Sequence, residues 1–506
     1  MDKVKIGWSE VDITPKKGVK IGLAGQFFER ITDQVESPLK IIAMAVESGH
    51  EQMIMVACDL VSVSDNLNRA VKENLKDKLE ISTDKVIISA IHSHTSYVYP
   101  RQNILTHKLK KSGKDATSSF DYLKKVLPSD MEYKVLVSSE KCISPKETFG
   151  FLVEKISEAV LCAWKNRKPA YYKNAFGRVA VGMCRRVCYD DGSAKMWGDT
   201  NLANFEVLEG GNDSGMELIY TYDENKELTG VVANIACPAQ VVEHRSFISS
   251  DYWGKVRENL KNKFGKDVKV LGLCAPAGDQ CPRDMIRWVN PETPIDDPNI
   301  KRENYIERRA DPSMFDISGL KVVGRRISNE IISVYEELDG EFKNQGLLIH
   351  KTKEVSLPLR TVSISEYEDA KKQIDDYIAK NRGKQMTFED NAKMHVYSGI
   401  MTRYQTQQKV NTIEIEVHFI RFGDIAIATS PFELFLDYGN QIRARSKAKQ
   451  TILVQLACGA DGYLPTKKAE QGGHYSAYVS SGTTGHVGGN MLVRTTLENI
   501  NEMFNE

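Results

Sequence analysis

The sequence predicts an α/β (α+β) protein in which mixed β-sheets are flanked by helices. Short β-branched runs bounded by turn residues indicate buried strands, as at 53–59, 86–91 and 268–274. An amphipathic segment from Ser64 to about residue 78 separates the first two runs, and the order strand, helix, strand is typical of an α/β layer. The 506 residues, of which 41% are hydrophobic, suffice to bury a large core.

The other elements follow from local patterns. Apolar runs predict strands, longer periodicity near 3.6 residues predicts helices, and clusters of turn residues separate them. On these grounds we expect strands at about 4–8 and 179–189, a hairpin at 218–236 with its turn at 223–226, helices at about 146–165 and from about 253, and strands again from about 412.

A single catalytic domain is expected to span residues 1–506, with three insertions. The insertion at about 100–145 is polar and lysine-rich, and two readings stay open for it: a flap beside a pocket or a solvated excursion. The insertion at about 285–315 is charged, bears prolines and lacks periodicity. The third, at about 366–410, is mainly helical and surface-like.

Charge and composition exclude several classes of function. The formal net charge is zero, so the chain has no electrostatic footprint for nucleic acid or for an anionic membrane. No signal-peptide pattern and no apolar run of about 18 residues is present, so we expect a cytoplasmic protein without stable membrane association. The nine cysteines form no CxxC pair, which favours a reducing compartment. The oligomeric state, a homo-oligomer included, stays open.

Two histidines stand at the carboxyl end of the predicted strand at 86–91. In an extended chain, His92 and His94 point to the same side and Ser93 points away. Two converging imidazoles suit a metal ion, alone or with an acid/base partner. They also suit half-buried histidines that bond to backbone carbonyls.

Six motifs extend this signal along the chain. They are Glu10–Pro15 (EVDITP), Ser89–His94 (SAIHSH), Ile248–Gly254 (ISSDYWG), Ala277–Pro282 (AGDQCP), Ser430–Leu434 (SPFEL) and Gly462–Thr466 (GYLPT). In these motifs and their order the chain resembles the neutral ceramidase family of zinc amidases. The resemblance implies a ceramidase-like catalytic domain, one Zn2+ per chain and metal-assisted hydrolysis. The extra carboxyl-terminal immunoglobulin-like domain of that family is not expected, because the chain stops soon after Gly462–Thr466.

The resemblance implies His92, Glu433 and Tyr463 as zinc ligands. The second histidine of the family belongs to a His-Pro step, and here that step is Cys237-Pro238. Three readings stay open. Cys237 supplies a thiolate ligand, which zinc accepts at about 2.3 Å; His244 takes the place; or the site has lost its metal.

The resemblance also implies the other site residues. His94 would be the acid/base or hold the oxyanion, and Tyr463 would stabilise charge developing on oxygen. Arg185 would anchor the substrate, although Arg186 competes for this role. Cys281 stands where the family has a serine, as a thiol donor or as a nucleophile. Further candidates at the substrate are Gly278 and Asp279, which would shape the backbone, and Gln26 in the loop at 22–30.

These inferences predict a cytoplasmic zinc hydrolase that cleaves an amide bond in a small polar or N-acylated molecule. Ceramide is a poor substrate candidate, because the chain shows neither a membrane helix nor a tail domain. Two alternatives stay open. The same apparatus could cleave an ester or a lactone, or the chain could be a non-catalytic relative that binds a small ligand.

Overall fold

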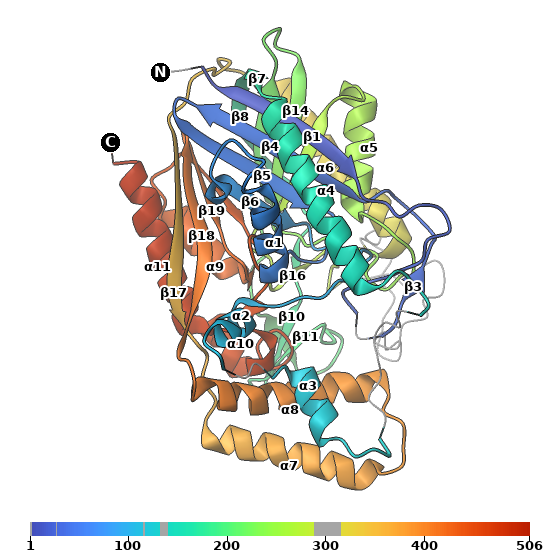
Figure 1. Cartoon of the computed structure of the whole chain (residues 1–506). Helices are drawn as coiled ribbons and strands as arrows, with labels where there is room; N and C mark the ends of the chain where they lie inside the picture. Colours follow the sequence, from blue (N-terminus) through green and yellow to red (C-terminus); the bar gives the residue numbers. More distant parts are fainter. Residues whose placement is uncertain (1–2, 27, 115–116, 132–139, 288–314, 506) are drawn as a thin grey trace.

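Three β-sheets build the body of the protein, and helices cover their outer faces (Figure 1). This computed structural model describes residues 3–26, 28–114, 117–131, 140–287 and 315–505. The α/β prediction with mixed sheets is therefore confirmed.

The first sheet has the order β6-β5-β4-β1-β7 and ends at the strand that leads to the histidines. Its only parallel pair is β5–β6, and α1 makes the crossover between these two strands. Helices α1 and α4 pack their apolar faces on the sheet. The elements are β1 (Lys5–Asp12), β4 (Lys40–Ser48), β5 (Glu51–Cys58), β6 (Val86–Ala90), β7 (Lys168–Pro169), α1 (Asp65–Leu75) and α4 (Pro145–Lys165).

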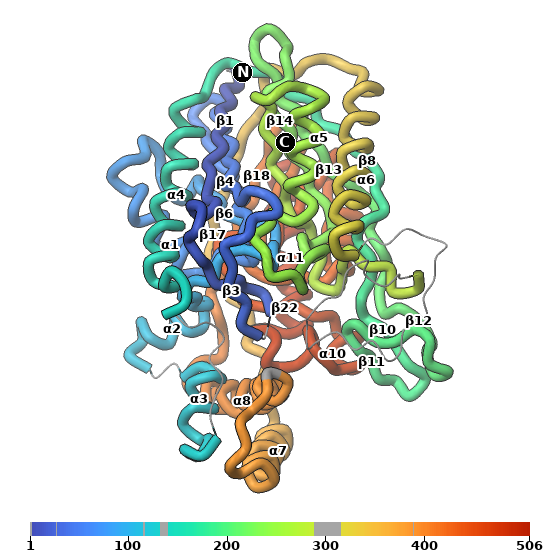
Figure 2. The backbone as a smooth tube through the Cα atoms, turned by 90° about the vertical axis from the view of Figure 1, so that its right-hand side faces the viewer, coloured from blue at the N-terminus to red at the C-terminus, as the bar shows by residue number. Residues whose placement is uncertain are grey.

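The second sheet has the order β15-β14-β13-β8, and the hairpin predicted at 218–236 forms its centre. Helices α5 and α6 cover it on the side opposite to α1 and α4, as Figure 2 shows. The elements are β8 (Tyr171–Arg178), β13 (Gly215–Tyr222), β14 (Leu228–Ile235), β15 (Lys269–Cys274), α5 (Tyr252–Phe264) and α6 (Asp316–Glu337).

The third sheet has the order β17-β18-β19-β21 and carries α9 and α11 on its outer side. The largest apolar core lies among the three sheets. The elements are β17 (Leu348–Pro358), β18 (Thr412–Phe422), β19 (Ile425–Thr429), β21 (Gln450–Val454), α9 (Leu436–Arg445) and α11 (His486–Met503).

Short pairs complete the loops around the site. The strand predicted at 179–189 is broken into β9 and β10, and Arg185 lies at the break. The short elements are β2 (Ile21–Gly22), β3 (Ile31–Thr32), β9 (Met183–Cys184), β10 (Arg186–Tyr189), β11 (Ala194–Met196), β12 (Phe205–Leu208), β16 (Gln280–Cys281), β20 (Glu433–Leu434), β22 (Tyr463–Leu464), α2 (Ile104–Lys111), α10 (Lys467–Gly472), and the 3-10 turns η1 (Thr83–Lys85) and η2 (Val479–Ser481).

Two of the three insertions pack on each other at one end of the molecule. Helix α3 (Ser119–Val126) lies against α7 (Ile364–Asn381) and α8 (Phe388–Gln407), below the sheets in Figures 1 and 2. They share a small apolar cluster of their own. Within the part of the chain at about 100–145, helix α3 thus packs on other helices. Most of the insertion at 285–315 lies outside the described residues. Within the described residues, no helix combines the length and hydropathy needed to cross a bilayer.

Candidate active site

His92 occupies a sharp turn rather than a strand. β6 ends at Ala90, and His92 has φ 72°, in the left-handed region. Strand alternation is therefore the wrong reason for the two histidines to meet. The His92 backbone N–H donates to the carbonyl of Leu60 (3.1 Å), and the ring Nδ1 faces the carbonyl of Val61 (2.7 Å). A carbonyl only accepts, so Nδ1 carries the proton and Nε2 presents a lone pair.

His94 is held between a glutamine and a glutamate. Arg185 donates through Nη1 to the Gln240 side-chain oxygen (3.0 Å), which turns the amide nitrogen of Gln240 toward His94 Nε2 (2.8 Å). His94 Nε2 therefore accepts, and Nδ1 lies 3.3 Å from Glu243 Oε2 without forming a hydrogen bond to it. Burial, together with His92, lowers the pKa of His94 well below its ordinary value, so the ring is neutral.

The Nε2 atom of His92 lies near two other Lewis-basic atoms. His92 Nε2 lies 3.2 Å from His94 Nε2 and 3.5 Å from Glu433 Oε2. With both imidazole protons on Nδ1, His94 Nε2 accepts from the Gln240 amide, and His92 Nε2 is left as an acceptor beside Glu433. Adjacent ligand atoms on a tetrahedral zinc ion with bonds of about 2.0–2.1 Å lie about 3.3 Å apart. Each of the two separations from His92 therefore suits a pair of zinc ligands, but His92, His94 and Glu433 do not bring three ligand atoms within 4.8 Å of one another.

Glu433 and Tyr463 reach the site together. They are register partners in the parallel pair β20–β22, which places both side chains at one edge. Burial, and then Glu433, raise the pKa of Tyr463 well above its ordinary value, so the phenol keeps its proton. The Tyr463 oxygen lies 3.4 Å from Arg185 Nη2, and the ring of Tyr475 contacts Tyr463 edge-on.

Neither residue proposed for the second histidine position comes to His92. Cys237 is fully buried in the core, and its Sγ donates to the carbonyl of Val181 (3.5 Å). His244 lies on the far side of Glu243, with its Nε2 3.3 Å from Glu243 Oε1 and its ring against Phe315. The structure therefore does not bring Cys237 or His244 into one group of ligand atoms with His92 and Glu433.

Arg185, not Arg186, faces the site. Besides Gln240 and Tyr463, Arg185 donates through Nη2 to the carbonyl of Gly278 (3.0 Å). Arg186 instead pairs with Glu209 (2.8 Å) and donates to the carbonyls of Ala469, Gly473 and Tyr475. Arg186 thus holds the loop that carries Tyr475.

The loop at 277–281 supports the site rather than lining it with reactive groups. Gly278 packs on the backbone of Glu433, where a β-carbon would lie 2.3 Å from the carbonyl oxygen. Asp279 Oδ1 accepts from the N–H of Leu436 at the start of α9 (2.9 Å), and burial raises its pKa to about 6. Burial raises the pKa of Cys281 to about 12, so it is a thiol, and Sγ donates to the carbonyl of Arg283 (3.3 Å).

The loop at 22–30 closes over His94. A β-carbon on Gly25, which has φ +96°, would meet the His94 ring at 2.4 Å. Gln26 donates through Nε2 to the carbonyl of Glu243 (3.2 Å). The guanidinium of Arg30 donates to the same carbonyl (2.7 Å) and to that of His94 (2.7 Å). Gln26 and Arg30 therefore both hold the backbone of Glu243, and Arg30 also holds the backbone of His94.

Sequence reasoning missed Gln240, Glu243 and Tyr475. The first two lie in the turn after β14, where no periodicity marks them. The only sequence signal is a polar group, Gln240 with Glu243-His244, a few residues beyond the Cys237-Pro238 step. Glu243 is 6% exposed. Burial favours its neutral form, but His244, His94 and Arg283 hold its pKa far below the ordinary value, so it is a carboxylate.

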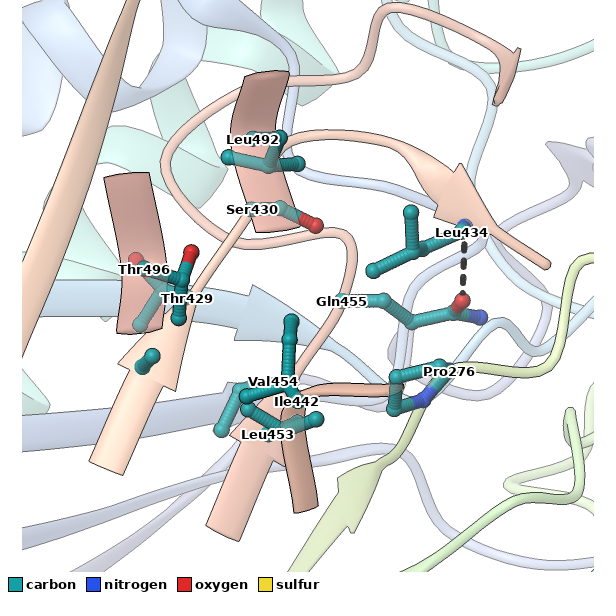
Figure 3. A pocket seen from close by; sticks show the side chains of 11 residues that line it. Pro276, Thr429, Ser430, Leu434, Ile442, Leu453, Val454, Gln455, Leu492 and Thr496 are labelled. Carbon is teal, nitrogen blue, oxygen red and sulfur yellow. Dashed lines mark hydrogen bonds between the residues drawn. The ribbon is translucent and has the colours of Figure 1, made fainter. Parts of the chain in front are cut away.

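A small pocket lies behind β20, not at the histidines (Figure 3). Its lining is mostly apolar, with Leu434, Leu453 and Pro276 among the side chains. Gln455 crosses it, and its side-chain oxygen accepts from the N–H groups of Leu434 and Ala277, both at 3.0 Å. Gln455 therefore ties β20 to the loop that holds Gly278.

Comparisons with known proteins identify structures that have a similar fold. No family model matches the sequence, and no curated protein is matched by it. The structure is similar to that of neutral ceramidase from Pseudomonas aeruginosa, with a TM-score of 0.66 and 15% identity over 99% of this chain and 75% of that one. It is also similar to a structure described as ceramidase complexed with C2, with a TM-score of 0.66 and 13% identity over 100% of this chain and 76% of the other. The resemblance inferred from the six motifs is thus confirmed for the fold: along its whole length this chain has the architecture of neutral ceramidases.

Proposed function

We propose that this protein is a zinc-dependent hydrolase that cleaves an amide bond in a small polar or N-acylated substrate. The observation that carries the proposal is the contact of His92 Nδ1 with the Val61 carbonyl (2.7 Å), which leaves Nε2 of the neutral ring as an acceptor. The Val61 carbonyl fixes the tautomer of this ring, and Nε2 is left facing Glu433 and His94 inside the protein. Metal-binding histidines have the same pattern, in which the second ring nitrogen donates to a carbonyl or a carboxylate.

His92, Glu433 and Tyr463 would hold the metal. The 3.5 Å contact of His92 with Glu433 and the pairing of Glu433 with Tyr463 in β20–β22 support this assignment. When bound, zinc supplies a Lewis acid for the scissile carbonyl and lowers the pKa of a water molecule toward neutrality. The other steps belong to the side chains of this chain.

Arg185 and Tyr463 supply donors for a developing oxyanion. Both groups are buried, and both keep their protons. Burial and Glu433 raise the pKa of Tyr463. Burial alone would lower the pKa of Arg185, but its acidic neighbours, the carboxylates of Glu433 and Glu243 among them, raise it above its ordinary value. Fixed donors in a dry site stabilise the charge that forms in acyl transfer. Arg185 also offers a cation to a polar or anionic part of the substrate.

His94 and Glu243 form a base and its orienting group. The neutral ring can accept a proton at Nε2, and Glu243 is placed to stabilise the imidazolium that results. Gln240 now occupies that nitrogen with its amide, so a substrate must displace the Gln240 side chain before His94 can take a proton. Cys281, as a buried thiol hydrogen-bonded to a carbonyl, is assigned no nucleophilic step.

The test combines zinc analysis with hydrolysis of a panel of N-acyl amides, esters and lactones. His92→Ala and Glu433→Gln should each abolish hydrolysis, and His92→Ala should remove one equivalent of zinc. His50→Ala and Glu354→Gln, at exposed positions, serve as controls of the same type. Hydrolysis of esters or lactones alone would replace the amide assignment. A folded protein that binds no zinc at His92 would contradict the proposal and favour a ligand-binding role.

A further inference from the structure

A second convergence of ligand atoms lies away from His92, at the seam between the first and third sheets. Glu416, His418 and Cys458 each offer one ligand atom, and these atoms lie within 4.8 Å of one another. Among the described residues this is the set of three histidine, cysteine or acidic side chains that meets this spacing. Glu416 and His418 share one face of β18, because side chains two residues apart in a strand point the same way.

Cys458 comes from the segment that follows β21. Its backbone N–H donates to the carbonyl of Ile88 in β6 (2.8 Å), and its carbonyl accepts from the Asn68 side chain (3.2 Å). These bonds hold Cys458 with φ 57°, in the left-handed region that non-glycine residues seldom adopt. The thiol is thereby directed to within 3.5 Å of His418 Nε2.

Hydrogen bonds fix the tautomer of His418 in two independent ways. His350 faces the carbonyl of Gln52 with Nδ1 (3.0 Å), so Nδ1 is protonated and Nε2 accepts from His418 Nδ1 (2.8 Å). Thr352 donates its hydroxyl proton to the carbonyl of Asp84 (2.7 Å), so toward His418 Nδ1 (3.3 Å) it can only accept. Both contacts place the His418 proton on Nδ1.

The lone pair of His418 Nε2 then faces a carboxylate and a sulfur. Glu416 Oε1 lies at 2.9 Å and Cys458 Sγ at 3.5 Å. Neither imidazole supplies a proton to the contact with Glu416. Gln52 to His350, His350 to His418 and His418 to Glu416 are three contacts, and two neutral imidazoles hold two N–H protons. The Cys458 thiol carries a further proton, which it can donate to His418 Nε2 or to Glu416. A nitrogen and a sulfur bound to one tetrahedral zinc ion lie about 3.5 Å apart, which matches the second distance.

We propose that Glu416, His418 and Cys458 bind a second zinc ion. Imidazole, thiolate and carboxylate are the ligand types that zinc prefers. Binding releases the Cys458 thiol proton to solvent, so one thiolate and one carboxylate offset the two charges of Zn2+, and the nearby Lys72 ammonium leaves the group with one positive charge. His350 and Thr352 orient the imidazole, and Lys72 orients the carboxylate through its ammonium, 2.6 Å from Glu416 Oε1. The Glu416 side chain is 27% exposed, which gives the ion a route of entry.

The role of this site is to join two sheets. Glu416 and His418 belong to β18, whereas Cys458 is bonded to β6, the strand that leads to His92. The same segment reaches the other side of the candidate active site. The N–H of Leu456 donates to the carbonyl of Phe432 (3.3 Å), the residue before Glu433. Zinc at Cys458 therefore stabilises the frame that positions both His92 and Glu433.

The experiment measures zinc per chain and X-ray absorption at the zinc edge, on full-length protein stripped with a chelator and reloaded with Zn2+. We expect two equivalents in the wild type. His92→Ala should keep one equivalent with a sulfur neighbour at about 2.3 Å. Cys458→Ser should lose one equivalent and the sulfur signal, whereas Cys237→Ser and Cys162→Ser, the latter at an exposed cysteine, should keep both.

A second measurement covers the case in which a variant folds poorly. Zn2+ should raise the unfolding temperature of His92→Ala and leave that of the His92→Ala/Cys458→Ser double variant unchanged. No zinc in His92→Ala, or zinc without a sulfur neighbour there, would overturn the proposal in favour of a shared proton at His418. A wild type with one equivalent that is lost in Cys458→Ser but kept in His92→Ala would refute the proposed active-site metal and leave this site standing.

Discussion

Gly278 lies so close to the backbone of Glu433 that a β-carbon at position 278 would be 2.3 Å from the Glu433 carbonyl oxygen. Gly278→Ala must therefore displace β20 and the carboxylate that it carries. We expect a loss of at least tenfold in zinc affinity at His92 and in kcat, because ligand positions matter to a few tenths of an ångström. Gly211→Ala, where an added β-carbon meets nothing within 4 Å, is the matched control. Equal zinc affinity in the two variants would show that Glu433 is not a ligand.

The neighbouring arginines should separate chemistry from stability. Arg185→Lys removes donors aimed at Tyr463, Gln240 and the Gly278 carbonyl, so kcat/KM should fall by about 10²–10³-fold, whereas the unfolding temperature should fall no more than in Arg186→Lys. Arg186→Lys breaks bonds to Glu209 and to several carbonyls, at a cost of about 2 kcal/mol or more in the free energy of unfolding. Steady-state kinetics and thermal melts check both. The reversed pattern would mean that Arg186 serves the substrate.

Glu243 should act through His94 rather than on the substrate. Glu243→Gln keeps the shape but loses the charge that would stabilise a protonated ring, so kcat should drop about 10–100-fold with KM nearly unchanged. Zinc content should stay at the wild-type value, because Glu243 is not among the proposed ligands. A large change in KM with a normal kcat would place Glu243 at the substrate instead.

Because the pKa of Asp251 is raised, we expect the free energy of unfolding to depend on pH in a way that does not involve the proposed metal sites. Burial raises the pKa of this carboxyl to about 7, and Glu243 adds to the shift, whereas the N–H groups of Val242 and Tyr252 oppose it. The folded state therefore holds the proton more tightly than the unfolded state, whose aspartate pKa is about 3.9. The stabilising contribution is complete below about pH 4 and is lost as the pH rises to about 7, by up to about 4 kcal/mol.

Asp251→Asn should flatten that part of the profile. Melting temperatures between pH 4 and pH 7 would fall in the wild type more steeply than in Asp251→Asn. Asp77→Asn, at an exposed turn, should follow the wild type. A slope identical in all three proteins would mean that Asp251 is ionised throughout this range.

Local sequence patterns were enough to predict the helices and hairpins whose formation depends on residues close together in the sequence. Helix α4 begins with a capping box at Ser144 and Glu147 and carries a continuous apolar face, and the hairpin of β13 and β14 turns where polar residues cluster. The pairing of Glu433 with Tyr463 depends on tertiary structure, and only the likeness of motifs indicated it.

The remaining site residues have no local signature. Gln240 matters because Arg185 orients its amide, a contact between two separate loops. Cys237 stands at the position where a ligand was expected, yet its thiol donates to the Val181 carbonyl in the core. Glu416 and His418 look like ordinary strand alternation until the fold brings Cys458 beside them. Side-chain direction after a strand ends is set by packing, which residue spacing does not encode.

The left-handed conformation of His92 means that stability and function favour different residues at this position. A side chain with a β-carbon loses about 1–2 kcal/mol there, which glycine would recover. Selection for heat resistance alone would therefore favour glycine over histidine at residue 92. Retaining the imidazole makes sense only for a protein that spends part of its stability on what the ring does.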